Sequence, residues 1–313
     1  MNSTFKRISL STVIAAAALL VGATSQAGDS PFGYIYTTDT HPKGSSEVEQ
    51  WFTSRRGKFQ GDYKLGQYRT EYEYGVTDRF QVSAYLESYS VSAMANDSAG
   101  RTSGPYVPEN ANPGTRYRRG LAFDGISTEF IYRVLSPYTD PVGLALYFEP
   151  SFRKYKTELE SKLILQKNYL DDRLVIGYNL TVSPEWEKKT GDPTAAPGSE
   201  ESQARTERSM ELEHMLGVAY RFAPGWSAAL EVRNHNEYST RNPKRQFQEH
   251  SAWFLGPTLH YGSKTWWATV TWLPQLRAAR CLSADQCAET QDRRIYGQEH
   301  ERNEFRLKVG LMF

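Results

Sequence analysis

The carboxy-terminal stretch EFRLKVGLMF, Glu304–Phe313, alternates apolar and charged residues. The apolar positions are Phe305, Leu307, Val309, Leu311 and Phe313, whereas Glu304, Arg306 and Lys308 lie between them. Because successive side chains of a β-strand point to opposite faces, this period predicts a strand with one apolar and one charged face. Chain termini usually fray into water, so we expect the final phenylalanine to lie in an apolar environment.

The first 27 residues predict export from the cytoplasm. Lys6 and Arg7 precede the apolar run Ile8–Val21, and small residues then lead to Ala27. The run is too short to span a bilayer and ends at a cleavage-like site, so we interpret residues 1–27 as a signal peptide cleaved after Ala27. A retained anchor is the alternative. No later stretch contains 18 consecutive apolar residues, which excludes a conventional transmembrane helix.

Composition favours a different kind of membrane protein. Charged residues make up 23% of the chain and aromatic residues 13%, including 20 tyrosines. A polar, aromatic-rich chain with apolar residues at alternate positions is typical of a transmembrane β-barrel. The formal net charge of +1 argues against nucleic acid as a partner.

The two-residue period recurs in twelve segments. In QYRTEYEYG, for example, tyrosine and threonine alternate with Gln67, Arg69, Glu71 and Glu73. The twelve predicted strands lie within residues 46–55, 67–75, 80–89, 125–134, 143–153, 158–168, 174–187, 209–220, 226–235, 251–261, 266–277 and 304–313. We therefore predict an all-β, closed antiparallel transmembrane barrel of about twelve strands over residues 46–313, preceded by a lead-in at residues 28–45. This lead-in is either an extra strand or a segment that faces the lumen.

Short and long connections alternate between these strands. The short ones, at residues 75–79, 136–142, 171–173, 222–225 and 262–264, are rich in Gly, Pro, Asp and Ser. The long ones are Arg56–Gly66, Ser92–Asp124, Lys188–Thr206, Ser239–His250 and Ala278–Arg302. This alternation is typical of periplasmic turns and extracellular loops. The tight link at Tyr155–Thr157 departs from it without a physical explanation.

Energetics decide which face meets lipid. If the charged face of the last strand met hydrocarbon, Arg306 and Lys308 would each cost roughly 2–4 kcal/mol near the midplane. The apolar face must therefore point to lipid and the charged face to the lumen, which excludes a soluble, lipocalin-like barrel. Because an open sheet edge cannot face hydrocarbon, we expect the last strand to pair with the first. Aromatic residues near the short turns, Tyr74, Tyr132, Tyr220, Trp226, Tyr261 and Trp266, are expected to form an interfacial belt.

The terminal F-x-L-x-V-x-L-x-F pattern resembles the assembly signal of Gram-negative outer-membrane barrels. The stretches YTTDTHPKGSSEVEQW, EYEYGVTDRFQVSAYL, ELESKLILQKNYLDDRLVIGYN and GPTLHY resemble an uncharacterised family of such barrels, a domain of unknown function. The resemblance covers most of the mature chain. It implies the barrel fold and an outer-membrane location, in contact with lipid, and the terminal pattern implies recognition by the barrel-assembly machinery. It implies no activity or catalytic residues.

The lumen-facing positions suggest a function. They include Arg69, Glu71, Glu73, Glu87, Glu129, Arg133, Glu149, Arg153, Glu211, Glu213, Glu231, Arg233, Arg306 and Lys308, in which acids outnumber bases. One interpretation is a narrow, acid-rich pore for a small polar or cationic solute. The alternative is a closed structural or surface-interaction barrel whose lumen is filled by salt bridges. Twelve strands lie between filled eight-stranded barrels and open porins, so strand number leaves both alternatives open.

An enzyme is a third, weaker possibility. His235 and Ser239 lie on one face of the stretch NHNEYST, but four residues of strand span about 13 Å, too far for a catalytic dyad. We therefore predict no catalytic residues, no cofactor and no metal site. His214 on the apolar face and His260 on the lumen face are interpreted as structural.

The remaining features lie in predicted loops. Cys281 and Cys287 are close in sequence in an exported chain, so we expect a disulfide. The basic clusters Arg55–Lys58, Arg116–Arg119, Lys244–Arg245 and Arg293–Arg294 are expected to face outward, where they could bind lipopolysaccharide phosphates or remain solvated.

Overall fold

The computed structural model describes residues 30–109, 111, 114–191, 195–200 and 202–313. The predicted signal peptide and its cleavage after Ala27 lie outside the described residues. Within the described part of the chain, no helix is long and apolar enough to cross a membrane.

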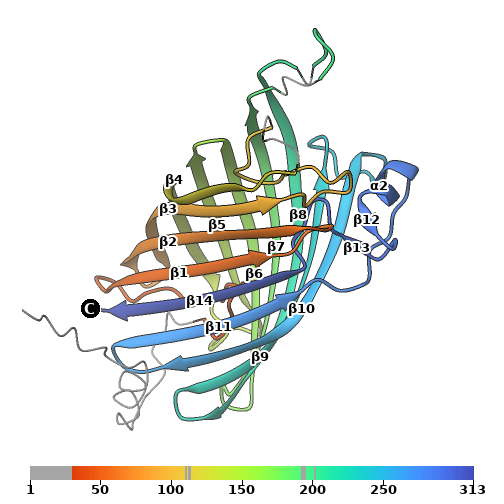
Figure 1. Ribbon diagram of the computed structural model, residues 1–313. Helices are drawn as coiled ribbons and strands as arrows, with labels where there is room; N and C mark the ends of the chain where they lie inside the picture. Colours follow the sequence, from red (N-terminus) through yellow and green to blue (C-terminus); the bar gives the residue numbers. More distant parts are fainter. Residues whose placement is uncertain (1–29, 110, 112–113, 192–194, 201) are drawn as a thin grey trace, which may run out of the picture.

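In the described residues, twelve strands form a closed antiparallel barrel, which confirms the predicted fold class (Figure 1). The strands are β1 (Ser46–Arg56), β2 (Asp62–Thr77), β3 (Phe80–Met94), β4 (Tyr117–Leu135), β5 (Gly143–Arg153), β6 (Lys156–Tyr169), β7 (Leu174–Lys189), β8 (Arg205–Ala223), β9 (Trp226–Tyr238), β10 (Gln248–Gly262), β11 (Trp266–Pro274) and β14 (Asn303–Met312). Each strand pairs with its neighbour in sequence, and β11 pairs with β14 across the last loop.

Pairing of β1 with β14 closes the barrel. The register runs from Glu47 opposite Met312 to Arg56 opposite Asn303, and the Phe313 amide donates to the Ser46 carbonyl at 2.9 Å. The first and last strands therefore leave no open edge to hydrocarbon, as the sequence predicts. Phe313 lies at the end that carries the short turns.

Side-chain orientation follows the predicted polarity along most of the wall. Leucines such as Leu86 and Leu230 are exposed on the outside, as are Phe305, Leu307 and Leu311 of β14. The wall carboxylates that alternate with outward residues are buried inside the barrel. At the turn end, the ring of Tyr261 contacts two tryptophan rings. Its centroid lies 4.8 Å from that of Trp226 and 5.0 Å from that of Trp266.

The first four long connections are shorter than the sequence pattern indicates, whereas the last loop is longer because β11 ends at Pro274. The predicted loop Ser92–Asp124 is reduced to residues 95–116, because β3 continues to Met94 and β4 begins at Tyr117. These strands extend beyond the region in which apolar and polar residues alternate. Their ends therefore lack the alternation from which the strands were predicted. The last loop, predicted without regular structure, contains helix α2 (Ala284–Ala288) and the short strands β12 (Thr290–Gln291) and β13 (Ile295–Tyr296). The β9–β10 loop contains the 3-10 turn η1 (Arg245–Phe247).

The apolar outer band generates a stability prediction. Leu230, whose side chain is 54% exposed, lies between the outward residues Ala228 and Val232 of β9. Leu230→Arg should lower the free energy of unfolding in lipid vesicles by about 2–4 kcal/mol, because a charge then faces hydrocarbon. Leu170→Arg is the control, since Leu170 is 63% exposed in the β6–β7 turn and should lose at most about 1 kcal/mol. Equal losses in denaturant titrations would contradict the assigned membrane face.

Candidate functional site in the barrel lumen

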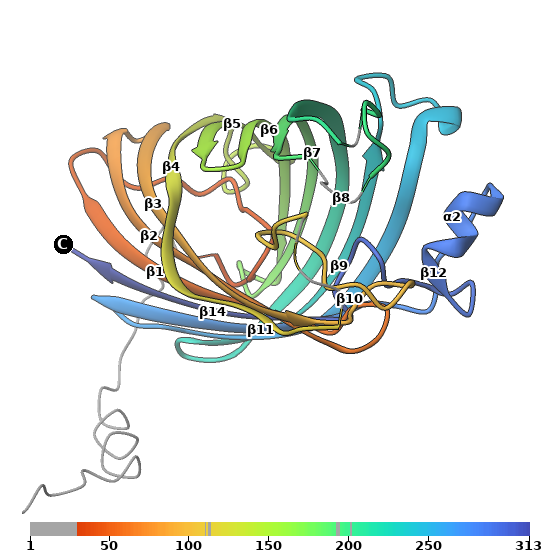
Figure 2. The ribbon, with the colours of Figure 1, turned by 45° about the horizontal axis from the view of Figure 1, so that its top comes forward.

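The chain before β1 lies inside the barrel, and we call residues 30–45 the lumen segment. In Figure 2 its red-orange coil runs within the ring of strands. Phe32, Thr38 and His41 are each at most 2% exposed. The segment carries no ladder pairing of its own, so it is a lumen-facing segment and not an additional strand of the sheet.

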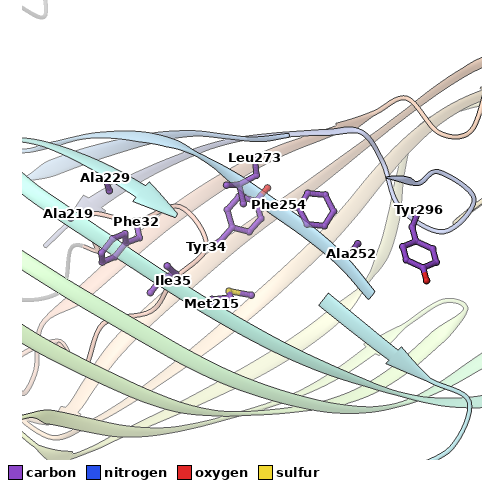
Figure 3. Packing of buried hydrophobic residues seen from close by; sticks show 10 residues of the cluster. All are labelled: Phe32, Tyr34, Ile35, Met215, Ala219, Ala229, Ala252, Phe254, Leu273 and Tyr296. Carbon is purple, nitrogen blue, oxygen red and sulfur yellow. The ribbon is translucent and has the colours of Figure 1, made fainter. Parts of the chain in front are cut away.

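Apolar contacts fix the amino-terminal part of the lumen segment. Phe32, Tyr34 and Ile35 form a buried cluster with wall residues that include Met215 and Phe254 (Figure 3). Small wall residues make room for them. A Cβ atom at Gly217 would lie 2.6 Å from both Phe32 and Ile35, and one at Gly177 would lie 3.0 Å from Ile35. The lumen, which the sequence predicts to be the polar side of the wall, is therefore apolar here, because the wall packs against an apolar segment.

Wall side chains also bind the main chain of the lumen segment. The Glu231 carboxylate accepts hydrogen bonds from the amides of Gly33 and Tyr34, at 2.7 and 2.9 Å. Asn179 accepts from the Tyr36 amide at 2.7 Å and donates to the Tyr36 carbonyl at 2.9 Å. These side chains take the place of a neighbouring strand, so buried main-chain groups of the segment are paired.

The same pattern continues toward the turn end of the barrel. Gln166 accepts from the Thr38 amide at 2.7 Å, and Gln81 accepts from the His41 amide at 3.0 Å. Burial raises the pKa of the Asp39 carboxyl, while a hydrogen bond from Tyr138 opposes this shift. Residues 33–41 are thus held mainly by wall side chains, whereas Gly44 and Ser45 are joined to Gly75 by main-chain hydrogen bonds.

An acidic cluster lies beside the His41 end of the lumen segment. One carboxylate oxygen from each of Glu49, Glu71 and Glu73 lies within 4.8 Å of the others. His41 Nε2 is 2.7 Å from Glu73, and Lys308 Nζ is 3.2 Å from Glu49. Glu71 is 1% exposed, and neither of its oxygens accepts a hydrogen bond from a described donor. Three carboxyl groups therefore lie close together here, with His41 and Lys308 as the adjacent basic side chains.

Elsewhere the wall charges pair with one another. Arg69 contacts Glu87 and Glu149 at 2.7 and 2.8 Å, and Arg153 also binds Glu87. Arg233 joins Glu213 to Glu304. The other predicted lumen residues have separate partners. Glu129 accepts a hydrogen bond from Tyr36, and Glu211 lies 3.6 Å from Lys156. Arg306 donates to the Gly33 carbonyl, and Arg133 donates to the carbonyl of Asp78 at the turn end.

The outer part of the lumen is covered by the β3–β4 loop. Tyr106 of this loop stacks on Tyr89 of β3, with ring centroids 4.0 Å apart, and donates a hydrogen bond to Asp124. Tyr106 and Val107 pack against a buried cluster on the inner face of β2 and β3 that includes Leu65 and Val91. Chain segments therefore enter the lumen from both ends.

Some predicted loop residues are placed differently. Arg55 and Lys58 were expected to face outward in a loop, but Arg55 lies inside near Glu304, and Lys58 is 3% exposed with Nζ bound to the Gln298 carbonyl. That part of the prediction is wrong, because Arg55 continues the inward phase of β1. Arg118, Arg119, Lys244, Arg245, Arg293 and Arg294 are exposed. Cys281 and Cys287 form a disulfide in the last loop.

The residues weighed for catalysis have separate partners. His235 Nδ1 faces Glu213, whereas the Ser239 hydroxyl donates to the Phe247 carbonyl at 3.3 Å. His214 points outward and contacts Tyr178, and His260 contacts Thr269 in the lumen.

Residues 24–313 match a family described as a family of unknown function (DUF6662). Solved structures with a similar fold include an outer membrane channel from Pseudomonas putida F1, with 11% identity, coverage of 88% of this chain and 98% of that chain, and a TM-score of 0.51. The NanC porin has 12% identity, coverage of 85% and 98%, and a TM-score of 0.46. The β domain of the Bordetella autotransporter BrkA has 11% identity, coverage of 87% and 100%, and a TM-score of 0.49. No curated protein matches the sequence. At these identities the likeness to the channel shows a shared fold.

The tight packing at Gly217 predicts how the lumen segment can be displaced. Gly217→Val should increase hydrogen exchange at the amides of Gly33, Tyr34 and Tyr36 by roughly tenfold or more, because overpacking a filled site costs about 1–3 kcal/mol. The control is Gly120→Val, since a Cβ atom at Gly120 meets no atom within 4 Å. Exchange can be followed by mass spectrometry of peptides from the lumen segment. Unchanged protection in Gly217→Val would contradict the observed packing.

Proposed function

This chain belongs to DUF6662, a family of unknown function, and we propose that it is a gated outer-membrane channel for small cations or small cationic solutes. The fold is that of a transmembrane barrel, and its inner wall is polar and rich in carboxylates. The observation that carries the proposal is a separable segment of chain seated on the acidic cluster of Glu49, Glu71 and Glu73.

Charge supports the choice of solute. Glu71 is buried in the cluster without a described hydrogen-bond donor, and Glu73 is contacted by His41 of the lumen segment. If the segment moved away, the cluster would lose that contact and face an open lumen. Rings or clusters of carboxylates in a narrow pore favour cations over anions.

The type of contact supports gating. The barrel wall is held by main-chain hydrogen bonds between neighbouring strands, whereas most polar contacts of residues 33–41 in the lumen segment come from side chains such as Glu231, Asn179 and Gln166. Each such hydrogen bond contributes about 0.5–1.5 kcal/mol net, because water can replace it. Displacement of the segment therefore leaves the closed sheet intact and hydrates the wall.

The second candidate function is a permanently closed structural barrel. The observation that favours it is the ion-pair network around Arg69, Arg153 and Arg233, in which wall carboxylates lie on both sides of each guanidinium. Such a network stiffens the wall whether or not solutes pass. The two functions differ in what happens once the lumen segment is gone.

Conductance separates these functions. In planar bilayers, the wild-type protein should open rarely, whereas a variant that lacks residues 30–42 but retains its export signal should show sustained currents. Gly217→Val should increase the open fraction and Gly120→Val should not, since only the first substitution crowds the lumen segment. Folding of each variant is checked by its shift in electrophoretic mobility on heating. A folded deletion variant that stays silent would contradict the channel and favour the structural barrel.

Ion selectivity tests the role of the acidic cluster. In the variant without residues 30–42, reversal potentials in a KCl gradient should give a K⁺/Cl⁻ permeability ratio above one. Adding Glu71→Gln should bring this ratio closer to one, because a negative charge leaves the lumen. The control is Glu207→Gln, at the exposed outer end of β8. A ratio that responds to Glu207→Gln but not to Glu71→Gln would contradict passage along the cluster.

A further inference from the structure

Three of the chain's six histidines meet at the outer end of the barrel. His235 lies near the end of β9, His250 near the start of β10, and His300 in the last loop just before β14. Their side chains are buried, with residue exposures of 5%, 3% and 8%. The ring centroid of His300 lies 4.7 Å from that of His235 and 4.5 Å from that of His250. One ring nitrogen from each residue lies within 4.8 Å of the others.

Carboxylates orient two of these rings. His235 Nδ1 bonds to Glu213, and His250 Nε2 lies 3.0 Å from a Glu237 oxygen. A carboxylate accepts the hydrogen of the ring nitrogen that faces it, so Nε2 of His235 and Nδ1 of His250 carry lone pairs and not hydrogens. Histidine ligands of metal ions almost always have such a carboxylate or carbonyl partner on the opposite nitrogen.

The third ring completes the set. His300 Nε2 lies 2.9 Å from His250 Nδ1. Because the hydrogen of His250 is on Nε2, the hydrogen of this contact belongs to His300 Nε2, which donates to His250 Nδ1. A shift of that hydrogen to Nδ1 of His300 would free the third lone pair without any change in total charge. The three ring nitrogens then form a face like that found in three-histidine zinc sites.

We propose that His235, His250 and His300 bind a divalent transition-metal ion, with Zn²⁺ as its representative. Imidazole nitrogens favour ions such as Zn²⁺, Cu²⁺ and Ni²⁺, whereas Ca²⁺ and Mg²⁺ require oxygen ligands. Metal–nitrogen distances of about 2.0–2.1 Å need a modest contraction of the cluster, which side-chain rotation can supply. Glu211 lies near the fourth position, since its Oε1 is 3.9 Å from His235 Nε2.

The positions of the three ligands imply that a bound ion would link the last loop to the barrel wall. His235 and His250 belong to the barrel wall, whereas His300 belongs to the last loop, residues 275–302, which also contains the Cys281–Cys287 disulfide. Hydrogen bonds already hold this loop to the β1–β2 turn, from the Arg302 amide to the Gly57 carbonyl and from Lys58 to the Gln298 carbonyl. A bound ion would fasten the loop to β9 and β10 as well. This inference does not depend on the channel.

Zinc binding to the tag-free mature protein in detergent tests the proposal. After treatment with a chelator, calorimetric titration with ZnCl₂ should show one site, and Co²⁺ should give the visible absorption of a tetrahedral complex. His300→Gln keeps a polar side chain of similar size and should weaken zinc binding by about a hundredfold or more, because even loss of an outer partner of a ligand costs about 10–100-fold. His260→Ala is the control, because His260 contacts Thr269 outside the cluster.

A second readout follows the loop directly. Zinc should slow hydrogen exchange in peptides from residues 275–302 of the wild-type protein, and it should have no such effect in His300→Gln. Absence of zinc binding by the folded wild-type protein would overturn the proposal. Binding that survives His300→Gln but is lost in His260→Ala would also overturn it. Failure of the conductance experiments would leave these results unaffected.

Discussion

The structure depends on the requirement that every main-chain hydrogen-bonding group within a bilayer has a partner inside the protein. Pairing of β1 with β14 meets this requirement, because it removes the two edges that an open sheet would present to hydrocarbon. Once the sheet is closed, alternation along each strand separates the side chains. Apolar residues such as Leu230 face lipid, and charged residues such as Glu304 and Arg233 are confined to the lumen.

This confinement creates a second requirement, since buried charges and polar groups inside a narrow barrel are unfavourable unless they are paired. The wall meets it in two ways. Guanidinium groups join carboxylates from different strands, and the lumen segment offers its main-chain amides to Glu231, Gln166 and Gln81. The Glu71 carboxyl accepts no hydrogen bond from a described donor, and this position is the basis of the proposed preference for cations.

The sequence predicts the barrel because its governing pattern is local. Alternation in β14, and the cost of exposing Arg306 and Lys308 to lipid, determine strand type and orientation without knowledge of distant contacts. The inward position of Arg55 could also have been predicted from the sequence, since Arg55 continues the alternation of the inward residues Glu47, Glu49 and Trp51. Small inward residues, Gly177 and Gly217, signalled that something packs against the wall, and the apolar residues of Phe32–Ile35 could have been matched to them.

Other features depend on long-range geometry. Arg69 and Arg233 pair with carboxylates from strands that are far apart in sequence. The alternation of residues within one strand does not say where that strand lies around the barrel, so these pairs could not be predicted. His300 joins His235 and His250 because a loop of irregular structure returns to the wall. Lys58 is buried for the same reason, which explains why its basic cluster was wrongly assigned to the outer surface.

The central claim is that a closed cylinder contains its own amino-terminal segment. An experimental density map of the mature protein in lipid nanodiscs, at a resolution that shows side chains, tests this most directly. The account predicts continuous density for Phe32–His41 along the inner wall, with the Glu231 carboxylate on the amides of Gly33 and Tyr34. An empty lumen with this segment outside the barrel, or a gap between β1 and β14, would contradict it.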